Sequence, residues 1–163
     1  MKNRGFTLIE IILVVALLTV VLAVTIPNFD SSYKSLQLRS TVDHMAYLLR
    51  YAQSHAVAAN RQVRLEFNGE FTNYWLSEEP KNDDGQINDG DSWQRVRGRL
   101  GREFSIPENI DIKISEGAGM FFYPDGRIEK KHITVCQNEK CFIVSTKEQR
   151  GRVQIYDAKD WKG

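Results

Sequence analysis

An apolar run of 21 residues near the N-terminus is the feature that most constrains this chain. The run extends from Phe6 to Ile26, follows a short basic leader that ends at Gly5, and contains a single carboxylate, Glu10. As an α-helix with a rise of about 1.5 Å per residue, it would be roughly 31 Å long, close to the thickness of the hydrocarbon core of a bilayer. The sequence therefore predicts a helix that inserts into a membrane.

The position of Glu10 inside this run predicts assembly after insertion. An ionised carboxylate in a membrane-spanning helix costs on the order of 2.5–3.5 kcal/mol. A simple anchor gains nothing from that cost, so we expect Glu10 to have a partner. Lys2 and Arg4 precede the run, and positive flanking residues stay in the cytoplasm. The C-terminal bulk of the chain is then expected in the periplasm or beyond.

The residues GFTLIE, with the apolar run and Pro27 behind them, resemble the class III signal of type IV prepilins and pseudopilins. This resemblance implies cleavage between Gly5 and Phe6 by a prepilin peptidase, methylation of the Phe6 amine, and polymerisation of the helix within a filament. It also implies that Glu10 pairs with the N-terminal amine of a neighbouring subunit. The partners implied are other pseudopilins or minor pilins, the peptidase that also methylates, and the bacterial inner membrane.

Two simpler interpretations of the N-terminus remain open at this stage. A secretory signal peptide has a basic start and an apolar core, but a small-residue cleavage site should follow, and Ala23-Val24-Thr25 is a poor version of one. A single-span anchor fits the length of the run. It leaves the Gly5–Phe6 junction and Glu10 unexplained.

The remainder of the chain has the size and charge of one neutral domain. Residues 29–163 carry 20 basic and 20 acidic side chains, so no bulk field draws this region to nucleic acid or to anionic lipid. The chain lacks the G-x-S-x-G, H-E-x-x-H and phosphate-loop patterns. We therefore predict no enzyme, no cofactor and no metal, and expect His132, which follows two lysines, to face solvent.

Two cysteines predict a disulfide. Cys136 and Cys141 bracket four residues between the strand-like runs His132–Val135 and Phe142–Ser145. A four-residue hairpin loop places them opposite each other, within disulfide reach. Bridges of this kind persist in an oxidising periplasm. A metal or redox role is disfavoured because the spacing is not C-x-x-C.

The helical period continues past Pro27 to about Asn60, and strand-like runs follow. Pro27 is expected to kink or locally melt the helix, because it lacks an amide hydrogen and clashes with the preceding turn. His44 and His55 are interpreted as ordinary helix residues. Hairpin signals occur at Asn68-Gly69 and at Pro124-Asp125-Gly126. The expected strands are Gln62–Phe67, Phe71–Ser77, Trp93–Arg99, Asn109–Ser115, Gly119–Tyr123, Arg127–Val135, Cys141–Thr146 and Arg152–Asp157.

These elements predict an α+β fold in which a long N-terminal helix packs on a C-terminal antiparallel β-sheet or sandwich domain. The membrane-spanning half of the helix comes first and its amphipathic half follows. The expected divisions are a cleaved leader at 1–5, a transmembrane and assembly helix at 6–27, an amphipathic continuation at 28–60, and a periplasmic β-rich domain at 61–163.

Four segments in order resemble the GspH/FimT family of minor pseudopilins and minor pilins. They read LRYAQSHAVAANRQVRL, IPENIDI, FFYPDGR and GRVQIY. The resemblance implies that Leu49–Leu65 ends the long helix and enters the first strand, and that the GRV-like segment forms a late strand. Gln53 and His55 stand where members usually have Arg and Glu, so a salt bridge is not carried over to them.

The resemblance leaves two functions open. The first is a structural minor pseudopilin of a type II secretion system that helps to initiate or cap the pseudopilus or contacts the exported protein. The second is a FimT-like minor pilin that binds DNA for uptake in transformation, through the basic residues Lys147, Arg150 and Arg152. Phosphate contacts by such side chains give salt-dependent affinity. A solvated hairpin end is the plainer interpretation of that cluster.

Two further charged segments carry open alternatives. Arg95, Arg97 and Arg99 alternate, so on a strand they would share one face, with Arg102 nearby. That face could bind acids of a neighbouring subunit, or DNA, or simply be solvated. The acidic loop 82–91 suggests calcium, but its acids do not match the known loop spacing, and a solvated loop is the simpler prediction.

Overall fold

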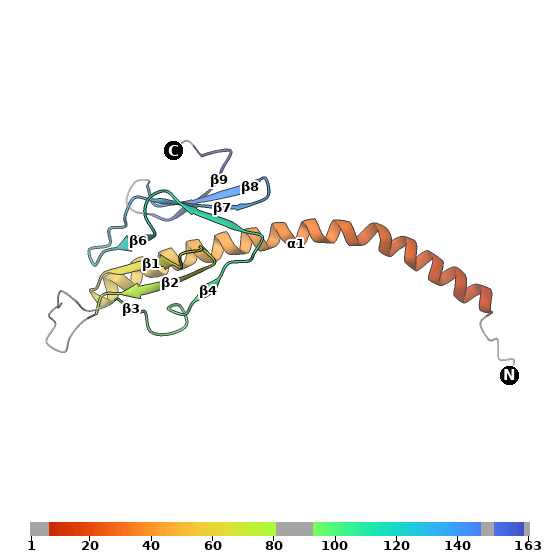
Figure 1. Cartoon of the computed structure of the whole chain (residues 1–163), viewed down its shortest axis with the longest axis horizontal. Coiled ribbons are helices and arrows are strands. Elements are labelled where there is room, and N and C mark those ends of the chain that lie inside the picture. Colours follow the sequence, from red (N-terminus) through yellow and green to blue (C-terminus); the bar gives the residue numbers. More distant parts are fainter. Residues whose placement is uncertain (1–6, 81–92, 148–151, 162–163) are drawn as a thin grey trace. The chain divides into compact units, whose positions relative to one another are not determined.

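The computed structural model describes residues 7–80, 93–147 and 152–161, without the side chains of 24–31. In this part of the chain one helix, α1 (Leu8–Ala59), precedes nine strands, and the chain separates into two compact units, Met1–Gln37 and Leu38–Gly163. In the second unit the helix packs against two antiparallel sheets (Figure 1). The predicted α+β fold is confirmed.

The sequence at the C-terminal end of α1 explains why the helix stops there. Asn60 adopts a left-handed conformation with φ of 50°. Its amide donates to the carbonyl of Val57 at 3.3 Å, and the amide of Arg61 donates to the carbonyl of Ala56 at 3.1 Å. This pair of hydrogen bonds is the Schellman motif, in which asparagine tolerates the left-handed position better than most residues. The predicted end near Asn60 follows from this chemistry.

One face of α1 forms the centre of the core of the second unit. Its buried side chains recur at three- and four-residue steps, as expected for an amphipathic helix. The buried positions are Leu38, Val42, Met45, Ala46, Leu48, Leu49, Ala52 and Ala56.

The first sheet has the strand order β3-β2-β1-β6, with β4 paired to the other end of β2. Inward side chains alternate with outward ones along its long strands, the pattern of a sheet covered on one face. The strands are β1 (Val63–Phe67), β2 (Asn73–Glu78), β3 (Gln94–Arg95), β4 (Phe104–Ser105) and β6 (Gly119–Phe122).

The second sheet has the order β5-β7-β8-β9. β7 and β8 form a hairpin in which Cys136 lies directly opposite Cys141, and the structure contains a disulfide between them. The hairpin spacing in the sequence predicted this bridge. The strands are β5 (Asp111–Ile114), β7 (His132–Gln137), β8 (Lys140–Ser145) and β9 (Gln154–Asp157).

The two predicted turns form by different chemistry. At Pro124-Asp125-Gly126 the amide of Gly126 donates to the carbonyl of Tyr123 at 3.0 Å, and Gly126 has φ of 83°. The β1–β2 hairpin instead uses a longer connection than a tight Asn68-Gly69 turn. The side-chain oxygen of Asn68 accepts the amides of Thr72 and Asn73 at 2.8 and 3.0 Å, and Phe71 takes the left-handed φ of 53°.

The predicted strand Trp93–Arg99 is wrong over most of its length. Only Gln94 and Arg95 pair with β2, so Arg95, Arg97 and Arg99 do not form a stripe on one strand face. The chain turns instead, with Gly98 at φ of 97°. The strand β4 that follows this turn was not predicted.

Candidate assembly site

The first turn of α1 is capped by the residue that precedes it. The hydroxyl oxygen of Thr7 accepts the amide of Glu10 at 3.3 Å, and the carbonyl of Thr7 accepts the amides of Glu10 and Ile11 at 3.1 and 3.3 Å. Thr-x-x-Glu is the spacing of a capping box, and a carboxylate in the first turn also favours the positive end of the helix dipole. Glu10 is exposed, and its carboxylate has no partner among the described residues.

Apolar side chains surround the N-terminal part of α1 on every side. Thr19 turns its hydroxyl back onto the helix, 2.8 Å from the carbonyl oxygen of Ala16. A helix that is apolar all round requires a covering environment. Twelve side chains, 46–77% exposed, form this apolar surface: Leu8, Ile9, Ile11, Ile12, Leu13, Val14, Val15, Leu17, Leu18, Val20, Val21 and Leu22.

Other predicted features of this segment are only partly described. None of the helices in the described part of the chain combines the length and the apolar character needed to cross a membrane. The helix is continuous through Pro27, whose side chain is outside the described set, so the kink stays a prediction. Gly5 and Phe6 lie outside the described residues.

His55 lies on α1, as predicted, and makes a specific contact that the sequence did not indicate. Its Nε2 lies 2.8 Å from a carboxylate oxygen of Glu78 at the end of β2, and Arg61 Nη1 lies 3.4 Å from the other oxygen. Gln53 donates from Nε2 to the carbonyl of Gly126 at 2.8 Å. Gln53 and His55 stand where the sequence resemblance leads one to expect Arg and Glu. Both nevertheless form hydrogen bonds between α1 and the strand region.

His44 also makes a specific contact that sequence reasoning missed. Its Nδ1 lies 2.7 Å from the hydroxyl of Tyr74, and its ring meets the ring of Phe104 edge-on at 4.6 Å. Burial, and secondly the charge of Arg102, lower the pKa of His44. Burial raises the pKa of Tyr74 to about 12. Both side chains are therefore neutral at pH 7.

The expectation that His132 faces solvent is met only in part, because its ring lies on the outward side of β7 but is partly covered. Its ring is half-buried and packs against Trp161 at a centroid distance of 5.7 Å. Burial, followed by the charge of Lys147, lowers the pKa of His132, and Glu116 opposes the shift. The described residues contain no group of three His, Cys, Asp or Glu that could hold a metal ion.

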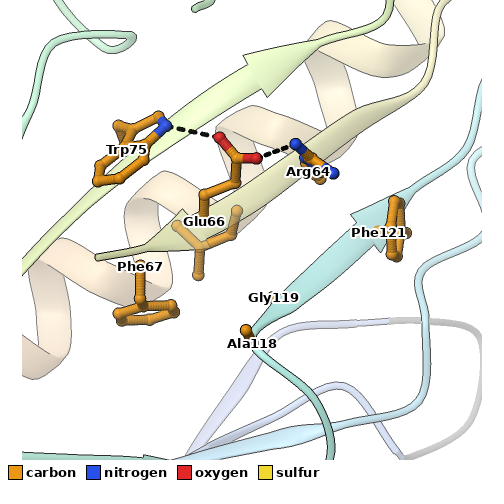
Figure 2. Close-up of a pocket in the computed structure, with 8 residues that line it drawn as sticks. Arg64, Glu66, Phe67, Trp75, Ala118, Gly119 and Phe121 are labelled. Atoms are coloured by element: carbon orange, nitrogen blue, oxygen red, sulfur yellow. Dashed lines mark hydrogen bonds and ion pairs between the residues drawn. The ribbon is translucent and has the colours of Figure 1, made fainter. Parts of the chain in front are cut away.

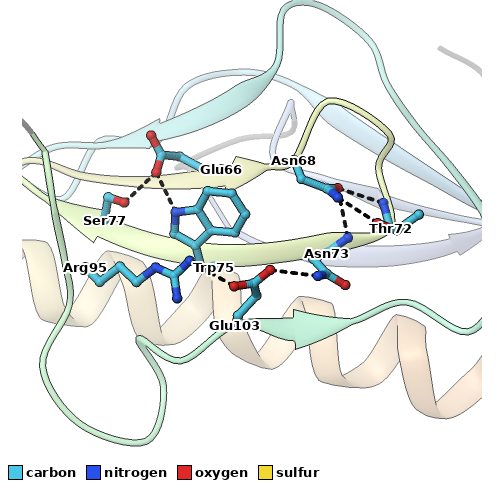
Figure 3. Close-up of polar contacts among 8 residues, drawn as sticks. All are labelled: Glu66, Asn68, Thr72, Asn73, Trp75, Ser77, Arg95 and Glu103. Atoms are coloured by element: carbon cyan, nitrogen blue, oxygen red, sulfur yellow. Dashed lines mark hydrogen bonds and ion pairs between the residues drawn. The ribbon is translucent and has the colours of Figure 1, made fainter.

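The outer face of the first sheet carries an interlocked set of polar and aromatic side chains. The carboxylate of Glu66 accepts hydrogen bonds from Trp75 Nε1 at 2.6 Å and from Ser77 Oγ at 2.5 Å, and it pairs with Arg64 (Figures 2 and 3). The guanidinium of Arg64 lies 4.3 Å from the ring centroid of Trp93. The Glu66 carboxylate, an acceptor shared by two donors, and the cation–π contact link side chains of β1 and β2 with Trp93.

A shallow cavity of about 290 Å³ opens beside this network, where β6 has no side chain at Gly119 (Figure 2). A Cβ atom at that position would lie 2.5 Å from the carbonyl oxygen of Leu65, so only glycine allows β6 to pair this closely with β1. At the edge of the face, Glu103 accepts from Asn73 Nδ2 at 2.7 Å and from Arg95 at 2.9 Å (Figure 3).

Comparison with known protein families agrees with this architecture. The family model described as "Type II transport protein GspH" matches residues 41–155. The chain belongs to the GspH family. A second model, the prokaryotic N-terminal methylation motif, matches residues 1–26, which include the leader, the apolar run and Glu10.

Solved structures with this fold include two minor subunits of filament systems. The minor pseudopilin EpsH from the type II secretion system of Vibrio cholerae superposes with a TM-score of 0.61 at 8% identity, over 74% of this chain and 97% of that chain. The type IV minor pilin FimU of Pseudomonas aeruginosa gives a TM-score of 0.54 at 18% identity, over 75% and 90%. The comparison with curated proteins gave no match.

Family membership carries several predictions with it. GspH-family proteins and these structural neighbours are pseudopilin or pilin subunits, not enzymes. The family implies a type II secretion pseudopilin role and assembly with other pseudopilins, and the methylation motif implies processing by a prepilin peptidase.

Two of the three basic residues considered for DNA binding, Lys147 and Arg152, lie at one end of the second sheet of this GspH-family chain. Ser145 pairs with Gln154, and Lys147 and Arg152 are exposed just beyond this pair. The amide of Lys147 donates to Ser145 Oγ at 3.2 Å. Arg150, like the acidic loop 82–91, lies outside the described residues, so the cluster is only partly described.

Proposed function

We propose that this protein is a minor pseudopilin that helps to initiate or cap the pseudopilus of a type II secretion system. In this proposal residues 6–27 insert in the bacterial inner membrane after removal of the leader 1–5, with the N-terminus cytoplasmic. The continuation of the helix at 28–60 then carries the β-rich domain at 61–163 in the periplasm. During assembly the N-terminal helix leaves the lipid and packs against the helices of neighbouring subunits. The β-rich domain of the assembled subunit can then contact an exported protein.

The observation that carries the proposal is the uncovered apolar surface of α1 with one carboxylate at its start. Twelve large apolar side chains between Leu8 and Leu22 are at least 46% exposed. At about 25 cal/mol per Å² of apolar surface, covering them gives a strong drive towards lipid or towards other apolar helices. Helices of neighbouring subunits would cover the same surface in a filament.

The proposed role of Glu10 follows from the position of the new N-terminus. Cleavage between Gly5 and Phe6 would leave a charged amine next to the capping residue Thr7. A cation at the positive end of a helix is disfavoured. A carboxylate from a neighbouring subunit would neutralise this amine, and the amine would in turn remove the cost of burying Glu10.

The test compares Glu10→Gln with Glu70→Gln in cells that carry the secretion system. Glu70 is an exposed carboxylate in the β1–β2 connection and serves as the matched control. We expect both variants to insert and to be cleaved. The Glu10 variant should be absent from purified pseudopili or cross-linked tip complexes, whereas the Glu70 variant should be present. Normal incorporation of the Glu10 variant would contradict the proposal.

A second candidate function is DNA binding for uptake. One observation favours it: Lys147 and Arg152 are both exposed at the same end of the second sheet, where they flank Arg150 in the chain. Two exposed cations in this position could contact adjacent phosphates. Gln154 stands where a further arginine would strengthen the cluster, and Glu148 lies within it.

A further inference from the structure

The connection between β3 and β4 (Figure 1) carries a second group of cationic side chains. Arg97, Arg99 and Arg102 are all exposed there, and none of them pairs with a carboxylate among the described residues. Other arginines in the described structure commonly pair with a carboxylate. The paired ones are Arg39, Arg61, Arg64, Arg95 and Arg127, each of which has an Asp or Glu within 4 Å.

Packing fixes the conformation of this connection. The buried Val96 donates its amide to the carbonyl of Leu76 at 3.0 Å, which anchors the start of the connection to β2. Gly98 has φ of 97°, and a Cβ atom at Gly101 would lie 1.6 Å from the carbonyl oxygen of Val96. Only glycine fits the second position, so the turn is tightly packed. The arginines are therefore displayed on a preorganised backbone.

A groove of about 480 Å³ runs between this connection and α1. Leu100 and Phe104 contribute apolar surface, and the guanidinium of Arg102 lies 5.2 Å from the ring centroid of Phe104. On the helix side the groove is lined by His44 and Tyr47, the second of which is 54% exposed. The groove thus combines an apolar lining with two cationic side chains, Arg99 and Arg102.

Two acids that neighbour groove residues in the sequence are bound by side chains outside the groove. Glu103, next to Arg102, is bound by Arg95 and Asn73 over the outer face of the first sheet (Figure 3). Asp43, next to His44, pairs with Arg39 at 3.3 Å. The carboxylates of Glu103 and Asp43 therefore do not pair with Arg99 or Arg102.

We propose that this groove docks an acidic segment of a partner protein, with a carboxylate between Arg99 and Arg102 and an apolar side chain against Leu100 and Phe104. A guanidinium is well suited to bind a carboxylate through two parallel hydrogen bonds. The volume is in the range that holds a few side chains. Because its residues belong to the second unit, this docking does not depend on Glu10 or on membrane insertion, and it fails or succeeds independently of them.

An acidic peptide fits this surface better than a nucleic acid. A nucleic acid strand would require a row of cations that follows its phosphates. The groove offers only two arginines beside an apolar lining, and residues 29–163 have no net charge.

The test measures fluorescence anisotropy of a labelled hexapeptide of alternating glutamate and leucine, with the full chain in a neutral detergent at low salt. We expect saturable binding that becomes weaker as salt is added. Binding should weaken at least about tenfold in Arg99→Gln/Arg102→Gln, since hydrogen bonds to charged groups are lost. The control Arg97→Gln removes one charge, against two in the double variant, from the same connection outside the groove, and should change the affinity less than about twofold.

Three outcomes would overturn the proposal. They are no binding of the glutamate peptide, equal binding of a peptide with glutamine in place of glutamate, and unchanged affinity in the Arg99/Arg102 variant. Stronger binding of a single-stranded oligonucleotide than of the peptide, with the same arginine dependence, would identify a nucleic acid surface instead. The thermal midpoint of each variant establishes that it is folded.

Discussion

Removal of the disulfide between Cys136 and Cys141 should weaken the second unit without unfolding it. The bridge joins directly opposed residues of β7 and β8, which are also paired along the rest of the hairpin. β7 is in addition paired with β5, and β8 with β9. The register of the hairpin is therefore held from both sides when the covalent link is absent.

The expected loss follows from the length of the closed loop. The two cysteines are separated by 5 positions in the sequence, so the bridge restricts the unfolded chain only modestly. In the chain-entropy model a loop of this size contributes about 2 kcal/mol at 25 °C, compared with about 3 kcal/mol for a loop of 15 residues. With a urea dependence of about 2 kcal/mol per M, the unfolding midpoint should fall by about 1 M.

The assay is urea unfolding of the full chain in a neutral detergent, followed by far-ultraviolet circular dichroism. Oxidised and reduced wild-type protein are compared with the double variant Cys136→Ala/Cys141→Ala. The variant should unfold near the reduced wild type, and a reductant should leave its midpoint unchanged. A loss above about 4 kcal/mol, or selective loss of amide protection in β7 and β8, would show that the bridge organises the hairpin. No measurable loss would refute the loop-entropy argument.

Three further predictions concern other parts of the second unit. Folding lowers the pKa of His44. The stability contributed by the neutral His44 is therefore complete above the unfolded pKa of about 6.5 and is lost as the pH falls through the lower folded pKa. His44→Gln should flatten the dependence of the unfolding free energy on pH in that window. Gly119→Ala places a Cβ atom 2.5 Å from a β1 carbonyl oxygen and should cost about 1–3 kcal/mol in thermal unfolding, whereas Gly69→Ala, with open space around it, should cost under about 0.5 kcal/mol. If the protein binds DNA, a mobility shift of duplex DNA should weaken with salt and with Arg150→Ala/Arg152→Ala; absence of a shift at low salt would remove that candidate.

Features that depend on neighbours in sequence were predicted well. The end of α1 was expected near Asn60, and a left-handed Asn60 closes the helix there. The disulfide was expected because two cysteines bracket a short loop between strand-like runs. The turn at Pro124-Asp125-Gly126 formed because proline and glycine restrict the same few residues. In each case the determining contacts lie within about six residues.

Features that depend on distant partners could not be read from the sequence. His55 and Glu78 are 23 positions apart, and neither residue type signals the other. Glu66 is likewise bound by donors from β2, at sequence separations of 9 and 11 positions. The arginine stripe failed for a different reason. The alternation was real, but Gly98 lies within it and Gly101 follows it, and the close packing of Gly101 on Val96 turns the chain before a strand can extend.

The two units of the chain differ in whether their own residues complete them. In the second unit the apolar face of α1 is covered by two sheets, and the charged groups that it buries have partners, as Glu78 has in His55 and Arg61. In the first unit the apolar side chains from Leu8 onward remain exposed, and the carboxylate of Glu10 has no partner among the described residues. Such a surface is stable only when another phase or another chain covers it. In the proposed function the membrane and neighbouring subunits provide this cover, so substitutions in the first unit should alter assembly while leaving the urea midpoint of the second unit unchanged.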